Sequence, residues 1–316
     1  MSSSFTKKRI DVVFGIAQDG FGGATQETLR GHRVSCQILS AGQESGIMCN
    51  LRIEGMGLDL MNRLSTVQAG VIMQSMNTVS VYAGAAQTER PVVFSGGIIE
   101  GFVDYSGAPD VAFEVRALST SIPAAVPIAP TSFKGAVTVA TVMETIAKKA
   151  GLAFNNNGVT AILAGGVTYN GTATEQIGLC AAATRTVYMI GMNTLFIWPS
   201  DFTADASGAI DVSAATGMIG YPAYSQYGVD VQTLFNPAIG FRSTLKLNSA
   251  YSPAAWVNKY GQLRSATGGT IYPPSNGLWV VQRLQHDLQS EVPDGPWVTT
   301  LTAARPEFAG MVTYAN

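Results

Sequence analysis

The sequence is poor in charge. Of its 316 residues, only 13% are Asp, Glu, Lys or Arg, whereas 47% are hydrophobic. The charged share is about half of that in an ordinary soluble protein. A lone monomer with so few charges has an unsuitable surface, because charged side chains keep proteins apart in solution. The composition is better explained if much of the surface is buried against other subunits, as in large obligate interfaces.

An excess of basic residues is also missing. The formal net charge is −2, which argues against a protein that binds nucleic-acid phosphates through a basic stripe. Long apolar runs are absent as well, since no window reaches the roughly 18 uninterrupted residues of a membrane-spanning helix. Near the start, Asp11 and Gly15 interrupt the apolar run that follows KKR, so no signal peptide is predicted. We therefore expect a soluble protein with no stable membrane insertion and no secretory export.

Cysteine and histidine are scarce. The three cysteines, Cys36, Cys49 and Cys180, are widely spaced and form no CxxC pair. Disulfide frameworks use even and dense sets, so we predict three free, buried thiols in a protein from a reducing cytoplasm. The only histidines are His32 and His286, and HEXXH is absent. No zinc site and no other cofactor is predicted.

The chain is rich in turns and short strands. It contains 34 Gly and 14 Pro, and residues 8–120 alternate between β-like runs and glycine-rich breaks. In DVAFEVRAL, Val111, Phe113 and Val115 share one face, which is the period of a half-buried strand. A helical period in residues 55–72 predicts one short helix between strands. Several short strands with regular turns favour a barrel or a sandwich.

A proline-rich stretch, SIPAAVPIAP, follows the first β region. Its closely spaced Pro123, Pro127 and Pro130 predict an extended connector and a domain boundary, because proline is disfavoured inside helices and sheets. After it, a helical face from Val139 to Ala150, a second helix over residues 172–184 and a hairpin turning near residues 192–193 predict a small α+β domain. The β pattern returns in the last part of the chain.

The predicted fold is therefore mainly β with an α+β insert. We expect a first β-barrel domain over residues 1–120, an α+β domain over residues 121–219 and a second β-barrel domain over residues 220–316. No repeat of fixed length stands out along the chain.

The neighbours His286 and Asp287 could be a general base and its orienting carboxylate. In a strand, however, successive side chains point to opposite faces of the sheet, so the two cannot bond as neighbours. An unbroken strand would place Leu284 with His286 on one face, and Trp279 with Val281 on the other. We therefore interpret the segment as a structural hairpin whose histidine lies in or near a core.

No catalytic, cofactor-binding or metal site is predicted. The carboxylates are scattered and nominate no facing pair of the kind that a glycosidase needs. The four tryptophans could stack on sugars or bases, but closing a core or an interface is favoured. The residues singled out are instead structural candidates at the hairpin and its turns, namely Asn276, Gly277, Trp279, His286, Gly295 and Trp297.

Several segments resemble a known family. They are PTSFKG leading into a helix with ETIAKKAGL, then LFNPAIGF, then NGLWVVQRLQHDLQSEVPDGPW. Together they resemble the baseplate hub proteins of contractile-tail bacteriophages, the group related to late control protein D and the Mu-type hub, over roughly residues 92–303. The segment GFRSTLKL departs from the usual run of small and β-branched residues, with Phe241 and Arg242 in place.

The resemblance implies a structural, non-enzymatic virion protein of the tail baseplate, assembled in the host cytoplasm. It implies a homotrimer with two tube-protein-like β-barrels in each subunit, forming a pseudo-sixfold ring. Such a ring would join the sixfold tail tube to the threefold central spike and initiate tube assembly. The implied partners are the tail tube protein, the central spike protein, and the baseplate wedge and tape-measure proteins. Phage DNA would pass through the lumen without specific binding.

Three alternatives stay open at this point. A tail tube protein would be a hexamer with one barrel in each subunit. A tail-associated cell-wall hydrolase would need a facing carboxylate pair or a metal cluster. A carbohydrate-binding module would use exposed aromatic rings.

Overall fold

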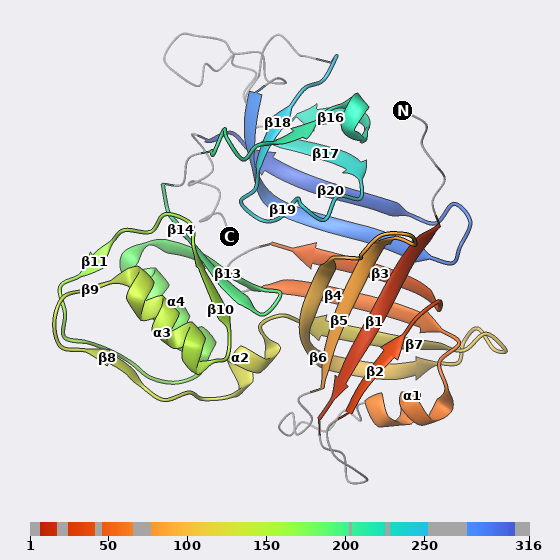
Figure 1. Ribbon diagram of the computed structural model, residues 1–316, viewed down its shortest axis with the longest axis horizontal. Coiled ribbons are helices and arrows are strands. Elements are labelled where there is room, and N and C mark those ends of the chain that lie inside the picture. The colour runs from red at the N-terminus through yellow and green to blue at the C-terminus, as the bar shows by residue number, and fades with distance from the viewer. Residues whose placement is uncertain are drawn as a thin grey trace, which may run out of the picture. The chain divides into compact units, whose positions relative to one another are not determined.

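The structure is a computed structural model of the chain. It describes residues 7–17, 25–41, 46–65, 77–201, 204–224, 228–251 and 277–306. The protein is mainly β with few helices, as predicted. It divides into two compact units: unit 1 is Met1–Ser200 with Leu288–Pro296, and unit 2 is Asp201–Asp287 with Trp297–Asn316. Figure 1 follows the elements of both units along the chain.

Unit 1 begins with antiparallel strands. They are β1 (Lys8–Ile16), β2 (Thr25–Leu29), β3 (Arg33–Ser40), β4 (Ile47–Glu54), β5 (Thr78–Ala85), β6 (Val92–Asp104) and β7 (Ala112–Leu118). Within the unit they pair in the order β3-β4-β7-β6-β5-β1-β2. In β7 the predicted alternation is confirmed from Phe113 onward, because Phe113 and Val115 are buried, whereas Glu114 is half-buried and Arg116 is exposed.

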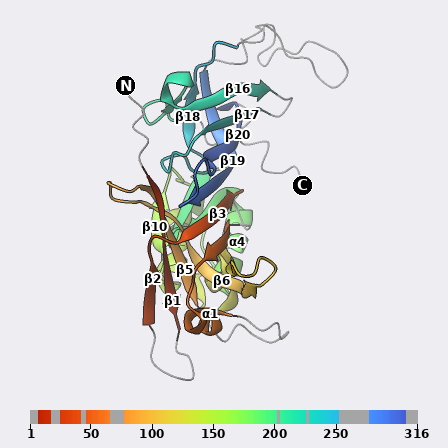
Figure 2. The ribbon, with the colours of Figure 1, turned by 90° about the vertical axis from the view of Figure 1, so that its right-hand side faces the viewer.

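A short helix, α1 (Leu58–Leu64), follows β4 and packs at the end of β6 (Figures 1 and 2). Its buried residues are Met61 and Leu64, three apart as an amphipathic helix requires. Asp59 in the first turn and Arg63 in the last match the helix dipole. The helix predicted within residues 55–72 is therefore present, and the part of that range from residue 66 onward lies outside the described residues.

The proline-rich segment differs from the prediction. Its first residues form a short helix, α2 (Ser121–Ala125), which contains Pro123. An extended connector was expected there, and that expectation is wrong. Proline is tolerated in the first turn of a helix, where its missing N–H has no acceptor to bond. The chain from Pro127 onward is extended, and Pro127 bridges to Thr172.

The rest of unit 1 is an α+β region. Its helices are α3 (Val139–Lys149) and α4 (Ala173–Thr184), and its strands are β8 (Thr131–Phe133), β9 (Val137–Thr138), β10 (Ala153–Asn156), β11 (Ile162–Leu163), β12 (Val167–Tyr169), β13 (Thr186–Gly191) and β14 (Thr194–Pro199). Strands β10, β14 and β13 form one sheet, with β10 parallel to β14. The two helices lie side by side (Figure 1).

Local sequence explains these helices. Thr138 caps α3 by accepting the N–H of Thr141, and Thr172 with Glu175 forms a reciprocal capping box on α4. Four of the positions predicted to face inward are fully buried, namely Val139, Val142, Met143 and Ile146, and Ala150 just after the helix is half-buried. They join a core cluster with Ile177 and Cys180 of α4 and Ile190 of β13.

The hairpin between β13 and β14 turns at Met192 and Asn193, as predicted. Both residues have positive φ, 48° and 58°. Two successive left-handed residues are the geometry of the tight hairpin turn whose twist matches the flanking strands.

Unit 2 contains the remaining strands. They are β15 (Ile210–Val212), β16 (Met218–Tyr224), β17 (Val229–Leu234), β18 (Thr244–Leu247), most of β19 (Gly277–Ser290), and β20 (Trp297–Ala304), with a 3₁₀ turn at Ala214–Thr216. Their order is β16-β17-β20-β19-β18-β15, and β15 is parallel to β18. Their core gathers around Trp279, Val281 and Leu284, with Val231 and Leu301 from β17 and β20.

Neither unit's ladders close into a ring among the described strands. The ladder of unit 1 ends at β2, and that of unit 2 ends at β15 and at β16. The barrels predicted from the sequence, and the division at residues 120 and 219, stay predictions. Within the ranges given above, no helix has the length and apolar character needed to span a membrane.

Candidate functional site

The histidine of the last hairpin is enclosed by side chains of unit 2. His286 is 5% exposed, and its Nδ1 lies 2.8 Å from Oγ1 of Thr299 on the neighbouring strand β20. The ring of Phe235 meets the imidazole edge-on at 5.2 Å between ring centroids. Thr299 is itself fully buried and accepts the N–H of Asn236 at 3.4 Å. The imidazole is thus a packed core group with one polar partner.

This environment disfavours the charged imidazolium. Burial lowers the pKa of His286 to about 4, and the nearby charge of Asp287 only partly opposes the shift. The Asp287 carboxylate accepts hydrogen bonds from Nε2 of Gln285 at 3.0 and 2.9 Å. The two neighbouring residues therefore have separate hydrogen-bond partners, His286 in the core and Asp287 on its own side of the strand.

The alternation along β19 is interrupted. Trp279, Val281 and Leu284 all belong to the same core cluster, so the predicted placement of Leu284 opposite Trp279 and Val281 is wrong. The change occurs where the partner strand ends. Beyond the pair Thr244–Val280, the N–H of Arg242 and the carbonyl of Ser243 bond to Val281, and Arg242 has a φ of +64°. The shift in the phase of β19 falls between Val281 and Leu284, next to this left-handed residue of the partner segment.

The predicted turn residues lie at the two ends of the hairpin. Gly277 is the first residue of β19 and has a φ of +141°, a value that favours glycine. Asn276 lies outside the described residues. At the other end, a Cβ on Gly295 would come within 3.0 Å of Gln289, so the small residue allows the turn to close. Trp297 opens β20 and packs edge-on against Phe235 at 5.4 Å.

The tip of the hairpin belongs to unit 1. Glu291 forms an ion pair with Lys7 Nζ at 2.6 Å. The Ser290 hydroxyl donates a hydrogen bond to the backbone carbonyl of His32 at 3.2 Å. These partners are more than 250 positions apart in the sequence. No local pattern signals such contacts, and sequence reasoning did not identify them.

The described tryptophans serve packing. Trp279 is 1% exposed and Trp198 is 6% exposed, and Trp198 stacks on Phe196. The interpretation that they close a core is confirmed for these two residues. Trp256 lies outside the described residues.

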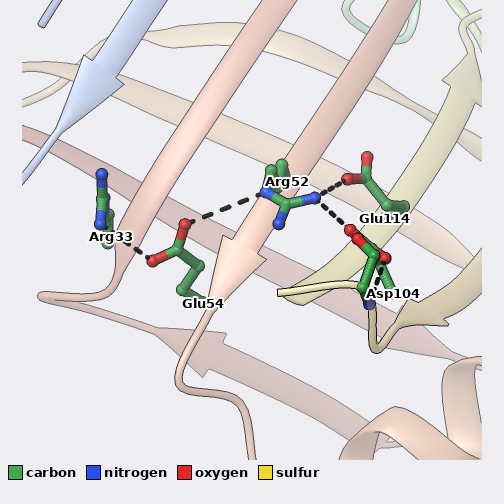
Figure 3. Close-up of polar contacts among 6 residues, drawn as sticks. Arg33, Arg52, Glu54, Asp104 and Glu114 are labelled. Carbon is green, nitrogen blue, oxygen red and sulfur yellow. Dashed lines mark hydrogen bonds and ion pairs between the residues drawn. The ribbon is translucent and has the colours of Figure 1, made fainter. Parts of the chain in front are cut away.

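A charged network lies on the strands of unit 1 (Figure 3). Arg52 of β4 donates through one NH group to Asp104 at 2.7 Å and to Glu114 at 2.6 Å. On its other side, Glu54 lies 3.9 Å from Arg52 Nε and 3.3 Å from Arg33. The network thus joins β3, β4, β6 and β7. Its members come together only through strand register, which sequence reasoning did not supply.

Hydrogen bonds set the ionisation of this network. The pKa of Asp104 lies well below its usual range, first because Ser106 donates to the carboxylate and then because Arg52 does. The pKa of Arg52 is raised by its bonds to Asp104 and Glu114. Asp104 and Arg52 therefore stay charged at neutral pH. Since they are partly exposed, their chief effect is to fix strand positions rather than to add much stability.

A groove of about 740 Å³ lies beside α2 and α4 in unit 1. It is lined by small and apolar groups, including Ala124, Gly178, Leu179 and Ala182. The one carboxylate of its lining, Glu175, accepts the N–H of Thr172 at 2.7 Å in the capping box. Its residues can contact an apolar segment, and they do not present a facing carboxylate pair.

The metal-binding residue types are dispersed. In the part of the chain that the structure describes, no three His, Cys, Asp or Glu side chains gather as a metal site. All three cysteines are free and buried, as predicted.

Large apolar side chains are exposed in both units. Tyr221 is 70% exposed and Leu58 is 59% exposed. The others are Ile99, Phe102, Tyr105, Val126, Ile162, Leu179, Met192, Ile219, Leu234 and Tyr251. Only 13% of the residues in the chain are charged. Exposed apolar side chains on such a surface are typical of interfaces with other proteins.

Comparison with known proteins places these features in a class. A tail protein from Neisseria meningitidis MC58 shares the fold, with a TM-score of 0.58 at 8% identity over 96% of this chain and 98% of that one. The E. coli c3393 protein matches with a TM-score of 0.53 at 9% identity, over 92% of this chain and 76% of that one. That protein is described as a component of the type VI secretion system that is similar to the T4 bacteriophage tail proteins gp27 and gp5. No curated protein matches by sequence.

The fold is thus one that a known tail protein shares. A family model described as baseplate hub gp41 matches residues 11–260. The chain belongs to this baseplate hub family. The resemblance read from the sequence is confirmed.

Proposed function

We propose that this chain is the trimeric hub of a phage baseplate, which joins the sixfold tail tube to the threefold central spike and initiates tube assembly. The observation that carries the proposal is the family match over residues 11–260. Two β regions in one chain support it, since three copies with two similar modules each would offer six binding positions to a sixfold tube. Closed symmetric rings are the usual form of such assemblies.

The domain arrangement follows from the same proposal. Residues 1–120 and 220–316 would form the two tube-like β-barrels, and residues 121–219 the α+β domain between them. Pairing between chains would cover strands that stand at the ends of the ladders, such as β2 and β16. Exposed apolar side chains on these units would lie against neighbouring copies and other tail proteins.

The proposed partners are the tail tube protein, the central spike protein, and the baseplate wedge and tape-measure proteins. The protein would be assembled in the host cytoplasm and act in the virion without enzymatic activity. Phage DNA would pass through the lumen, and a chain with a formal charge of −2 would not retain its phosphates.

The mass of the purified protein in solution tests the trimer. Light scattering coupled to size-exclusion chromatography should give about three times the chain mass of 33.2 kDa. A mass six times that of the chain would support a tail tube protein instead. A monomer at all concentrations would contradict the proposal.

The non-enzymatic role has a separate test. Purified protein incubated with peptidoglycan should release no soluble fragments, while a lysozyme control under the same conditions should do so. Release that persists after repeated purification would show a cell-wall hydrolase and overturn this part of the proposal.

A further inference from the structure

Two of the three cysteines lie next to each other in the core of unit 1. Cys36 of β3 is 3% exposed and Cys49 of β4 is fully buried, and their sulfur atoms are 3.8 Å apart. The third, Cys180, lies in the separate core cluster of the α+β region. The hub role proposed above uses none of these thiols.

Strand register explains the closeness. In the antiparallel β3–β4 pair, Cys36 lies opposite Leu51, and Cys49 lies opposite Ile38. The two cysteines are therefore diagonal neighbours, offset by two residues and on the same core-facing side of the sheet. A disulfide needs its sulfur atoms about 2 Å apart, so their separation has to shrink by a little under half. Diagonal neighbours lie about 7–8 Å apart at the backbone, at the limit that a disulfide bridges, so the two strands also have to shift slightly toward each other.

We propose that Cys36 and Cys49 are a buried dithiol that a mild two-electron oxidant converts to a disulfide joining β3 to β4. In the reaction two S–H bonds break and one S–S bond forms, and the oxidant takes up two electrons and two protons. With the azo compound diamide, one thiolate adds to the N=N bond. The second sulfur then displaces the resulting hydrazine.

The thiols stay reduced while the protein is made and assembled, because cytoplasmic conditions keep thiols reduced. Burial also raises the pKa of Cys49, which keeps the reactive thiolate rare. Oxidation therefore needs local opening of the strand pair and proceeds slowly once the protein is outside the cell. The bond then closes a short loop between neighbouring strands, which restricts the unfolded chain more than the folded one.

Thiol counting on the purified full chain tests the proposal. The protein is treated with diamide, unfolded in denaturant and titrated with a thiol reagent. The untreated chain should show three thiols and the oxidised chain one, and peptide mapping should show residue 36 linked to residue 49. The thermal unfolding midpoint of the oxidised form should rise by about 5 °C. Three thiols after prolonged oxidation would overturn the proposal, as would linkage between chains.

Matched variants identify the pair. The Cys180→Ser variant retains Cys36 and Cys49, and it should lose both thiols on oxidation. The Cys49→Ser variant retains Cys36 and Cys180, and it should keep both thiols. Loss of two thiols from Cys49→Ser would show that Cys36 pairs with Cys180 and would overturn the assignment. Peptide mapping of the unaltered chain decides the question independently if a variant fails to fold. None of these outcomes depends on whether the protein is a trimer.

Discussion

At the scale of single residues, burial and hydrogen bonding decide what each polar group does. Histidine often acts as a catalytic base, but His286 lies in the core. Thr299 is its hydrogen-bond partner and Phe235 packs against its ring. Arg52 has the opposite setting, because it lies at the sheet surface between two carboxylates. For each of the two residues we make a prediction that a measurement of pH dependence can test.

The stability of the fold should depend on the protonation of His286. Its folded pKa of about 4 lies below the unfolded value of about 6.5. The unfolded chain therefore binds a proton first as pH falls. The stabilising contribution is complete above pH 6.5 and is lost as pH falls toward 4, by about 3 kcal/mol. Urea unfolding of the wild type and of His286→Gln between pH 7 and 4 measures it.

The variant should be less stable at pH 7 and should lose less stability on acidification than the wild type. His32→Gln is the matched control, because it removes the other histidine, which is only half-buried. Equal pH slopes for the wild type and His286→Gln would contradict the assignment.

Removing the guanidinium of Arg52 should raise the pKa of Asp104. In Arg52→Met the bond at 2.7 Å to the carboxylate is lost, but the donors of Ser106 remain. The pKa should therefore move toward the ordinary value without reaching it. NMR titration of the Asp104 carboxyl carbon measures the shift, and Arg33→Met, which contacts only Glu54 in this network, should leave it unchanged. An unchanged pKa in Arg52→Met would show that Ser106 alone sets it.

At the scale of elements, a side chain fixes the position of the extended segment before β8. The segment before β8 is extended, and proline removes the N–H of residues 127 and 130 from any ladder. It is held instead by Lys149 of α3, whose Nζ donates to the carbonyls of Ala129 and Pro130 at 3.3 and 2.7 Å and to Thr131 at 2.8 Å. The connector is thus fixed to the α+β region by a lysine at the end of a helix.

Lys149→Met should loosen this connector. The amides of Ile128 and Thr131 should exchange with solvent on the order of fivefold faster, because a charge-assisted bond to an exposed lysine contributes modestly. Hydrogen exchange followed by NMR measures the change. Lys148→Met, the neighbouring exposed lysine, is the control and should leave both rates unaltered. Equal exchange in both variants would mean that the bridge from Pro127 to Thr172 suffices.

The sequence predicted the elements whose signals are local. Period-two burial identified β7, helix periodicity and caps identified α3 and α4, and the hairpin at residues 192–193 was located by its turn. The two failures have different origins. Helix α2 is possible because Pro123 falls in its first turn, where proline is tolerated. Strand β19 changes phase beside the left-handed Arg242 of a separate segment, and the periodicity of β19 does not reveal that contact.

The candidate site was predictable only in part. That His286 belongs to a strand, with its neighbour on the other face, follows from alternation. Its partner Thr299, the charged network around Arg52 and the contact between Lys7 and Glu291 depend on strand register or on distant segments meeting. A single sequence does not specify such pairings.

At the scale of the whole molecule, low charge and exposed apolar side chains point to surfaces that other subunits cover. The family match gives these surfaces a place in the phage baseplate. The proposed hub extends that place to a ring of three chains, in which two β modules of each chain alternate around one lumen.

Electron microscopy of the purified protein tests this claim most directly. Class averages viewed along the ring axis should show threefold symmetry, with six similar densities around a central opening. Isolated single subunits at every protein concentration, or a true sixfold ring with one module from each chain, would contradict the account.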